Sequence, residues 1–317
     1  MNPIIKTENL VKRYGDLIAL DHLNLEVYPG EIFGLLGPNG SGKTSAINTI
    51  LSLLTYDKGS ISLFGRPMQP DAYDIKRRIG LVMQEVAVFD ELTVYRNIRY
   101  FCGLYERDKR KLDSLTEEAI SFTGLDEFRN FYPKKLSGGL LRRLNIACGI
   151  AHKPELIFMD EPTVAVDPQA RNSILEGIQR LHAQGSTIVY TSHYMEEVEQ
   201  ICTRIAIMDK GRVVALGTKE ELKNMINLGE SITAELMTPH DASLEDGLRG
   251  LPGVISVQPE DSNLVIRTAK GQTSLAAVMA YMDSKGVRYG RVWAQRPTLN
   301  DVFLEITGKT LRDSPAL

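Results

Sequence analysis

Residues 37–44 read Gly-Pro-Asn-Gly-Ser-Gly-Lys-Thr, and they directly follow the apolar run Ile32–Leu36. This is the G-x-x-x-x-G-K-[ST] pattern of a phosphate-binding loop, placed between an expected buried strand and an expected helix. Glycines let the backbone turn tightly, so several N–H groups converge on phosphate oxygens, and the following helix adds its positive end. The stretch predicts an α/β domain of the P-loop NTPase class that binds a nucleoside triphosphate.

Two residues at the end of this loop carry the expected chemistry. Lys43 supplies a cation to the β- and γ-phosphates, and Thr44 offers a hydroxyl to Mg²⁺. The residues expected to surround the nucleotide here are Gly37, Pro38, Asn39, Gly40, Ser41, Gly42, Lys43, Thr44 and Ser45.

The composition is that of an ordinary globular protein. The 317 residues are 43% hydrophobic and 24% charged, and this length favours two domains. The net charge is −3, so no strong basic field is available to hold nucleic acid. The three cysteines, at 102, 148 and 202, lack C-x-x-C spacing and indicate neither a disulfide frame nor a zinc site.

The chain shows no sequence signal for membrane insertion. No run approaches the roughly 18 uninterrupted apolar residues of a spanning helix, and the N-terminus lacks an apolar stretch behind a basic start. We therefore expect a peripheral protein at the cytoplasmic face of the cell membrane, if it serves a membrane process. Another chain would then supply the membrane part.

Apolar runs alternate with helix-like segments through the first two-thirds of the chain. Leu156–Asp160 and Thr187–Thr191 are almost entirely apolar, which is typical of parallel strands buried on both faces. Ile4–Leu10 and Ala19–Val27 carry more polar residues and predict an antiparallel flap. The sheet is therefore expected to be mixed.

A hairpin and a helical subdomain complete the predicted first domain, residues 1–226. Arg204–Met208 and Arg212–Leu216 are joined by Asp-Lys-Gly, which favours a hairpin. A helical subdomain is expected over about residues 90–150. It includes an apolar stripe at helical spacing, and core packing explains that stripe best: Val94, Ile98, Phe101 and Tyr105.

The pattern changes after residue 226, which predicts a small accessory domain over residues 227–317. Its expected elements follow the order β-α-β-β-α-β of a ferredoxin-like α+β fold. A last helix is expected from Thr298, with Gly308 ending it. The expected strands are 231–237, 253–258, 263–268 and 289–295, and the expected helices are 242–248 and 274–285.

Two adjacent carboxylates, Asp160 and Glu161, end the second buried strand. Paired acids are often only a solvated strand end. Downstream of a phosphate loop they predict a catalytic pair, in which Asp160 holds Mg²⁺ and Glu161 polarises the attacking water.

The stretch Leu136-Ser137-Gly138-Gly139 precedes a helix with one apolar face, and Ser137 is a natural N-cap. An ordinary capped helix would explain it alone. The stretch also resembles the signature loop, LSGGQ, of the ATP-binding-cassette (ABC) ATPases.

This resemblance covers about residues 4–226 and implies roles for further residues. Gln84 matches the Q-loop glutamine, near Mg²⁺ and the coupling surface, and Asp167 matches the D-loop. His193 matches the switch histidine that contacts the γ-phosphate, and Tyr14 matches the aromatic residue that stacks on adenine. The family mechanism also implies that Ser137, Gly138 and Gly139 cap the ATP of a second subunit.

Each chain carries one phosphate loop and one signature loop, so the resemblance implies a dimer around two MgATP. The second subunit would be another copy or a close paralogue. Leu140 stands where the family has Gln, and it also simply extends the apolar face of its helix. The D-loop reads Ala-Val-Asp instead of Gly-Leu-Asp, and ATPase activity is expected to survive both departures.

Residues 296–308 and Asp90–Val94 resemble cassettes that pair with ABC-2-type permeases, many of them drug or antibiotic exporters. The expected function is the ATPase subunit of such an exporter, with Phe89 and Tyr95 as contacts to a separate permease or as plain core residues. An importer ATPase and a soluble ABC ATPase acting on DNA or ribosomes are the alternatives. Importer cassettes can also have C-terminal domains, usually of small β-barrel type. The soluble types carry long coiled coils or two cassettes in one chain, and neither feature is present in this sequence. The transported substrate does not follow from the sequence.

Overall fold

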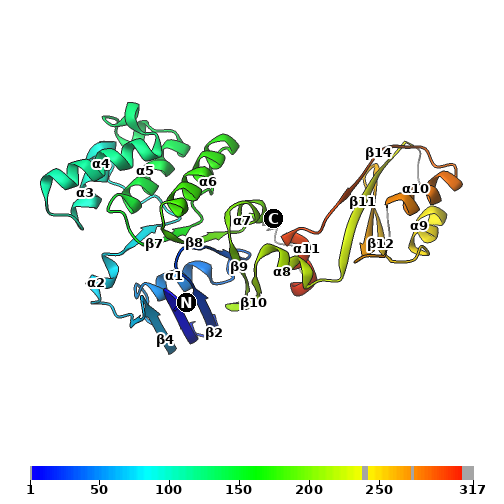
Figure 1. Cartoon of the computed structure of the whole chain (residues 1–317), viewed down its shortest axis with the longest axis horizontal. Helices are drawn as coiled ribbons and strands as arrows, with labels where there is room; N and C mark the ends of the chain where they lie inside the picture. Colours follow the sequence, from blue (N-terminus) through cyan, green and yellow to red (C-terminus); the bar gives the residue numbers. More distant parts are fainter. Residues whose placement is uncertain (1, 238–241, 273–274, 309–317) are drawn as a thin grey trace. The chain divides into compact units, whose positions relative to one another are not determined.

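The computed structural model describes residues 2–237, 242–272 and 275–308, and the chain divides into two compact units (Figure 1). The first unit ends at Lys219 and the second begins at Glu220. The sequence pattern indicates a boundary after residue 226, so the division lies earlier in the chain. It assigns helix α8 (Lys219–Asn224) almost entirely to the second unit.

The first unit opens with an antiparallel sheet, in agreement with the predicted flap. Its strands β1 (Ile5–Tyr14), β2 (Leu17–Val27), β4 (Lys58–Leu63) and β5 (Arg66–Pro67) lie in the order β2-β1-β4-β5. Tyr14 pairs with Leu17 across a two-residue turn, where Gly15 adopts a φ of 57°. Positive φ at this tight turn is a conformation that glycine reaches without strain.

A six-stranded sheet forms the centre of the first unit, in the order β10-β9-β3-β8-β7-β6. All neighbours are parallel except β9 and β10, which form the predicted hairpin. The inner strands β3, β7 and β8 are buried at every position. Their bounds are β3 (Ile32–Leu36), β6 (Ile79–Val82), β7 (Leu156–Asp160), β8 (Thr187–Ser192), β9 (Arg204–Asp209) and β10 (Arg212–Gly217).

The strand register brings the predicted site residues to one edge of this sheet. Leu36 lies beside Ser192, and Asp160 lies beside Thr191. The phosphate loop, the paired carboxylates and His193 each follow one of these three strand ends. Carboxyl ends of neighbouring parallel strands are the usual place for a ligand site in an open α/β sheet.

Helices cover the sheet and build a subdomain with its own core. Helix α1 (Lys43–Ile50) packs on β7 and the flap, and α7 (Met195–Ile201) packs on β3 and β8. Short α2 (Tyr73–Lys76) precedes β6, and α6 (Pro168–Ala183) contacts α5 and α7.

The expected helical subdomain is present around three mutually packed helices. These are α3 (Val94–Gly103), α4 (Lys109–Thr123) and α5 (Gly138–Ile150), with two 3₁₀ turns between α4 and α5, η1 (Asp126–Phe128) and η2 (Pro133–Lys135). Val94 and Ile98 are fully buried in its core, which confirms the core interpretation for the start of that apolar stripe. Phe101 packs against the same core, whereas Tyr105 stacks on His152 with ring centroids 3.8 Å apart.

The second unit has the predicted ferredoxin-like topology. Four antiparallel strands lie in the order β12-β13-β11-β14, and α9 and α10 connect them as expected. Thr298 caps the last helix with Asp301, and Gly308 ends it with a φ of 66°. Ser274 of the predicted second helix lies outside the described residues. The elements are β11 (Leu228–Leu236), α9 (Ala242–Arg249), β12 (Val254–Glu260), β13 (Asn263–Ala269), α10 (Leu275–Ser284), β14 (Tyr289–Gln295) and α11 (Leu299–Thr307).

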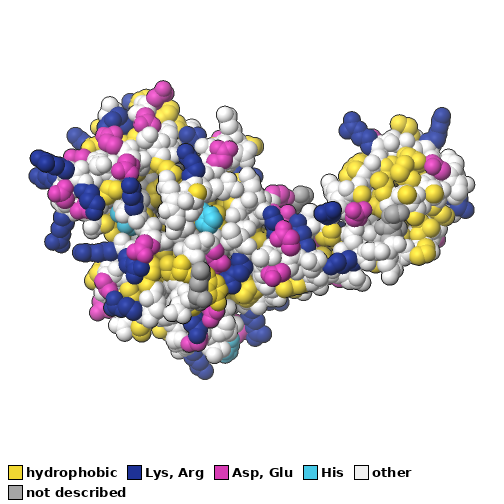
Figure 2. Space-filling model, in the orientation of Figure 1, with side chains coloured by type: hydrophobic (Ala, Val, Ile, Leu, Met, Phe, Trp, Pro, Cys, Tyr) yellow, Lys and Arg dark blue, Asp and Glu magenta, His cyan; other side chains and the backbone are white. Residues whose placement is uncertain are grey.

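Two further features of the structure concern the distribution of surface charge and the character of the helices. Basic and acidic side chains are interspersed over the face of the first unit that Figure 2 shows. Within the three described ranges, no helix combines the length and the apolar character needed to cross a membrane.

Candidate functional site: a nucleotide-binding edge

The loop between β3 and α1 requires glycine where it meets the surrounding backbone. A Cβ atom at Gly37 would lie 2.4 Å from the carbonyl oxygen of Met208, and one at Gly42 would lie 2.6 Å from that of Ala19. Gly42, the N-cap of α1, also has a φ of 104° and provides no side-chain cap. The first amide groups of α1 are therefore left for another acceptor, which is the property of an anion site.

Ser41 supplies a second indication of a ligand at this loop. Its side chain is buried, and its Oγ has no hydrogen-bond partner among the residues that the structure describes. Its main-chain oxygen accepts from Gly211 N at 2.9 Å, which holds the loop against the turn after β9. A buried hydroxyl without a partner is costly unless a ligand satisfies it. A phosphate oxygen fits that requirement.

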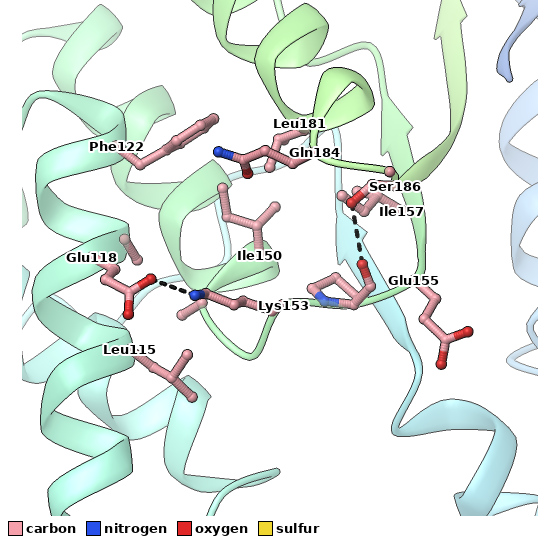
Figure 3. Close-up of a pocket in the computed structure, with 14 residues that line it drawn as sticks. Leu115, Glu118, Phe122, Ile150, Lys153, Glu155, Ile157, Leu181, Gln184 and Ser186 are labelled. Atoms are coloured by element: carbon pink, nitrogen blue, oxygen red, sulfur yellow. Dashed lines mark hydrogen bonds and ion pairs between the residues drawn. The ribbon is translucent and has the colours of Figure 1, made fainter. Parts of the chain in front are cut away.

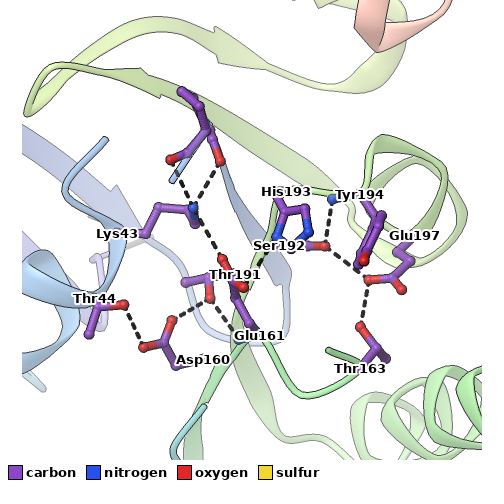
Figure 4. Close-up of polar contacts among 12 residues, drawn as sticks. Lys43, Thr44, Asp160, Glu161, Thr163, Thr191, Ser192, His193, Tyr194 and Glu197 are labelled. Atoms are coloured by element: carbon purple, nitrogen blue, oxygen red, sulfur yellow. Dashed lines mark hydrogen bonds and ion pairs between the residues drawn. The ribbon is translucent and has the colours of Figure 1, made fainter. Parts of the chain in front are cut away.

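Lys43 begins α1 with a buried ammonium group (Figure 4). Its Nζ donates to the carbonyl oxygens of Gly37 at 2.8 Å and Pro38 at 3.2 Å, and it lies 3.2 Å from Oε1 of Glu161. One cation therefore bridges the phosphate loop and the carboxylate after β7. Ser45 lies one residue further into α1, where its main-chain oxygen accepts from Thr49 Oγ1.

Asp160 lies at the end of β7 and receives two hydroxyl groups. Thr44 Oγ1 donates to its Oδ2 at 2.8 Å, and Thr191 Oγ1 donates to its Oδ1 at 2.6 Å. The structure thus brings together the two residues predicted to hold Mg²⁺, Thr44 and Asp160. The described residues contain no cluster of three or more His, Cys, Asp or Glu suited to a metal. Mg²⁺ commonly needs only one or two carboxylates with water and phosphate oxygens, so this donor set fits it.

Glu161 follows Asp160 with a φ of 46°, and its side chain faces different partners. Its N–H donates to Thr191 Oγ1 at 2.9 Å, Oε1 lies near Lys43, and Oε2 lies 3.2 Å from His193 Nδ1. Burial raises the pKa of the Glu161 carboxyl, but the hydrogen bond from His193 and the charge of Lys43 outweigh it and lower the pKa overall. Glu161 is therefore ionised at neutral pH, as a general base must be.

His193 directly follows β8 and completes this group, which we call the catalytic cluster: Lys43, Asp160, Glu161 and His193. Its imidazole is about one-fifth exposed, and its centroid lies 4.1 Å from that of Tyr194. These side chains come from three separate strand–loop junctions, and only the sheet brings them together.

Two predicted residues do not join the catalytic cluster. Gln84 is exposed after β6, and its side chain makes no hydrogen bond within the described parts of the chain, although its carbonyl oxygen accepts from Arg142 Nη1 at 2.7 Å. Tyr14, at the end of β1, is 46% exposed, with Lys12 Nζ 5.0 Å from its ring centroid. Its open aromatic face suits stacking on a flat ring.

The signature-like residues lie at the start of α5, beside the D-loop of the same chain. Ser137 is the N-cap and accepts from Leu140 N at 3.3 Å. A Cβ atom at Gly139 would lie 2.8 Å from Ala170 Cβ and 3.7 Å from Asp167 Oδ2, so only glycine allows this approach. Gly138 is exposed, and a Cβ atom placed there would lie 3.9 Å from the Ala165 carbonyl oxygen.

Two departures from the family pattern have plain structural explanations. Leu140 and Leu141 are partly buried against the core of the helical subdomain, as the apolar face predicts. Asp167 accepts from Ala170 N at 2.9 Å and caps α6, so the altered D-loop retains its acidic cap.

Sequence reasoning missed two residues that hold the loop after β6. Arg142 and Asn145 are buried on α5, and both donate to the carbonyl oxygen of Met83. Asn145 Oδ1 also accepts from Ala87 N at 3.1 Å. The available signal was weak: two polar residues three apart on an otherwise apolar helix face.

A separate hollow of about 490 Å³ lies between α4, the end of α5 and the end of α6 (Figure 3). Leu115, Phe122, Ile150 and Leu181 line it, and Glu118 forms an ion pair with Lys153 beside it. Glu155, which also lines it, precedes β7, so the hollow adjoins the opposite end of this strand from Asp160. It is not part of the catalytic cluster.

Comparison with known proteins shows which family this chain is similar to. The profile of the ABC transporter family matches residues 20–164, and that of the C-terminal domain of DrrA1-3-like ATP-binding proteins matches residues 217–307. The chain is 35% identical to the linearmycin resistance ATP-binding protein LnrL of Bacillus subtilis, covering 98% of this chain and 100% of that protein.

Two further relatives match over nearly their whole lengths. The Nod factor export ATP-binding protein I of Cupriavidus metallidurans is 34% identical, over 99% of this chain and 100% of that one. The daunorubicin resistance ATP-binding protein DrrA3 of Streptomyces coeruleorubidus is 34% identical, over 97% of each.

Solved structures show the same fold. A bacterial ABC transporter cassette determined as a dimer superposes with a TM-score of 0.63 at 27% identity, covering 68% of this chain and 98% of that one. A dimeric post-hydrolysis state of the same cassette, bound to ADP and phosphate, gives 0.62 at 26% identity, with the same coverage of both chains.

Proposed function

This chain belongs to the ABC transporter family of ATP-binding proteins and is an ATPase, and we propose that it is the ATP-hydrolysing subunit of an ABC-2-type exporter. The relatives named above serve linearmycin resistance, daunorubicin resistance and Nod factor export. The ferredoxin-like second unit differs from the β-barrel usual in importer cassettes, and its profile match is to a DrrA-type domain. Export of an antibiotic is the function that the two resistance proteins among these relatives favour for this chain.

In this proposal, each residue of the catalytic cluster has a role, and so do the phosphate loop, Thr44, Gln84 and Tyr14. Residues 37–43 hold the phosphates through main-chain amides, Ser41 Oγ and Lys43 Nζ. Thr44 and Asp160 would hold Mg²⁺, which when bound would neutralise phosphate charge. Gln84, exposed on the loop after β6, would keep the role near Mg²⁺ that the family resemblance implies. Glu161 accepts the proton of the attacking water, and His193 holds Glu161 and the γ-phosphate in place. Tyr14 stacks on the adenine.

The second half of the site comes, in this proposal, from another subunit. Gly139 lies close to Ala170 and Asp167 of its own chain, and α5 lies with α3, α4 and α6 in Figure 1, away from α1. A nucleotide on the phosphate loop of one subunit would therefore meet the α5 start of its partner. The γ-phosphate charge is then shared by two helix N-termini, so hydrolysis weakens the dimer.

The permease would dock on the loop after β6 at the cytoplasmic face of the membrane. Phe89 is 42% exposed and forms an aromatic cluster with Tyr100 and Phe101, at centroid distances of 5.0 and 5.7 Å. Aromatic side chains with open faces are typical anchors at interfaces. Tyr95 instead packs on the subdomain core beneath Arg129, which supports Phe89 and Tyr100 as the contact residues.

The observation that carries this proposal is the buried contact chain from Lys43 through Glu161 to His193. Replacing Glu161 with Gln should lower turnover by about 10²- to 10⁴-fold while ATP binding persists. With Mg²⁺ and ATP present, light scattering should then show a stable dimer. Glu176→Gln, an exposed carboxylate on α6, is the matched control. Unchanged turnover in the Glu161 variant would exclude Glu161 as the base.

The export direction needs a separate experiment. We expect expression of this chain with its membrane partner to protect a sensitive bacterial strain against an amphipathic antibiotic, and Lys43→Ala to abolish protection. Accumulation of the compound inside the cells, in a manner dependent on ATP hydrolysis, would instead support the importer alternative.

A further inference from the structure

A buried carboxylate outside the catalytic cluster makes hydrogen bonds to residues near both Glu161 and His193. Glu197, on α7, is 3% exposed. Its Oε2 accepts from three hydroxyl groups: Thr163 at 2.8 Å, Tyr190 at 2.7 Å and Ser192 at 2.9 Å (Figure 4). Its Oε1 lies 3.3 Å from Arg171 Nε but makes no hydrogen bond within residues 2–237, 242–272 and 275–308.

The residues bound by Glu197 flank the proposed base and its histidine partner. Thr163 follows Glu161 by two residues, and Ser192 directly precedes His193. Ser192 Oγ also accepts from Tyr194 N at 2.9 Å, which fixes the turn that carries His193. One carboxylate oxygen therefore joins the segment after β7 to the end of β8.

Arg171 provides a second connection to the same histidine. Its guanidinium lies 4.7 Å from the ring centroid of Tyr194, whose ring packs against that of His193. Arg171 belongs to the first turn of α6, whose N-cap is Asp167 of the D-loop. Glu197 thus faces groups from the loop after β7, from β8 and from α6.

Burying a carboxylate is costly, and its hydrogen bonds repay that cost only when the geometry is good. The apolar side chains of Val198 and Ile201 on the same helix are buried as well, so α7 also has apolar packing that does not involve this charge. We propose that Glu197 is a positioning residue that sets the distance between His193 and Glu161 and thereby the rate of ATP hydrolysis. This inference rests on the roles proposed above for those two residues.

The first test replaces Glu197 with Gln in the full-length chain. A glutamine removes the negative charge, and if its oxygen keeps the three hydroxyl donors, its amide N–H groups must face the Arg171 guanidinium, a donor against a donor. Because a displacement of about 1 Å at a reacting group can cost up to 10²-fold in rate, we expect kcat to fall at least about tenfold. KM for ATP should stay within about twofold, since the polar partners of Glu197 are Thr163, Tyr190, Ser192 and Arg171, which lie outside the phosphate loop. Glu196→Gln, the exposed neighbour on α7, is the control and should match wild type.

The second test separates positioning from a purely structural role. The His193→Ala variant has no imidazole for Glu197 to position against Glu161. Adding Glu197→Gln to that variant should therefore change the single-turnover rate of ATP hydrolysis by less than about twofold. An equal further loss in both backgrounds would overturn the proposal. So would a folded Glu197→Gln chain with wild-type kcat.

The same experiment distinguishes this inference from the proposed function. If His193→Ala hydrolyses ATP as fast as wild type, the role of His193 itself fails. If His193→Ala is impaired but Glu197→Gln is not, only the positioning role fails. Should Glu197→Gln not fold, Thr163→Val removes a single donor at nearly constant shape, and it should lower kcat with KM unchanged. Wild-type kcat in that variant overturns the proposal.

Discussion

At the scale of single residues, two opposite charges of the candidate site are buried against each other. The side chains of Lys43 and Glu161 are both 5% exposed and lie 3.2 Å apart. Each charge compensates part of the desolvation of the other, and His193 adds a hydrogen bond to the carboxylate. Single substitutions here therefore affect both ligand binding and the local fold.

Lys43→Ala should weaken nucleotide binding, because a cation that faces several phosphate oxygens is lost. A hydrogen bond to a charged group contributes about 1.5–3 kcal/mol, so Kd for ATP should rise roughly 10- to 150-fold. Isothermal titration calorimetry measures the change. Lys58→Ala, at an exposed position on β4, is the control. Equal ATP affinity of the Lys43 variant and wild type would show that main-chain amides alone hold the phosphates.

Among the elements, α3 and α5 hold the long segment between β6 and the helical subdomain. Asn97, fully buried on α3, accepts from Phe89 N at 2.8 Å. Its Nδ2 lies within 3.2 Å of the carbonyl oxygens of Phe89, Leu92 and Thr93. Arg142 and Asn145 hold the earlier part of this segment from α5. The proposed permease surface is thus fastened from two helices by side-chain-to-backbone bonds.

Asn97→Ala should lower the free energy of unfolding by about 2–3 kcal/mol, since it leaves several buried backbone groups without a partner. Chemical denaturation measures this loss. Any stimulation of the ATPase by the permease should fall as well, because Phe89 is no longer held. Arg96→Gln, exposed on the same helix, should be neutral in both measurements. An equally small effect of both variants would argue against the anchoring role of Asn97.

At the scale of the whole molecule, the two units differ in what they contribute. All residues of the catalytic cluster, and every hydrogen bond quoted for them, belong to the first unit. The second unit has a core of its own, built from Ile232, Leu264, Ile266, Val278 and neighbouring side chains. Separate cores are the usual mark of parts that fold independently.

A chain ending at Lys219 should therefore fold and hydrolyse ATP at a rate of the same order as the full-length protein. Circular dichroism checks the fold, and a phosphate-release assay checks turnover. A folded but inactive product would show that the second unit helps to assemble the active dimer.

The sequence predicted those features that depend on local residue chemistry. Residues 37–44 need glycine and a lysine at set spacing, so the pattern alone indicates a phosphate loop. The positions of the buried apolar strands along the chain and the ferredoxin-like unit followed from periodicity, and the structure confirms both. The departure at Leu140 was equally readable, because an apolar residue extending an apolar helix face has a local explanation.

Other features were decided only when distant segments met. Glu197 reads as one of several glutamates in a short acidic helix, and its importance comes from Thr163, Tyr190 and Ser192, up to 34 residues away in the chain. Arg142 and Asn145 likewise depend on a loop about 60 residues earlier, with separations of 58, 59 and 62 residues. Local pattern determines which element forms, because backbone geometry and burial act between near neighbours. The partner of a buried polar group is determined by the packing of the sheet and helices, and packing is a property of the folded chain.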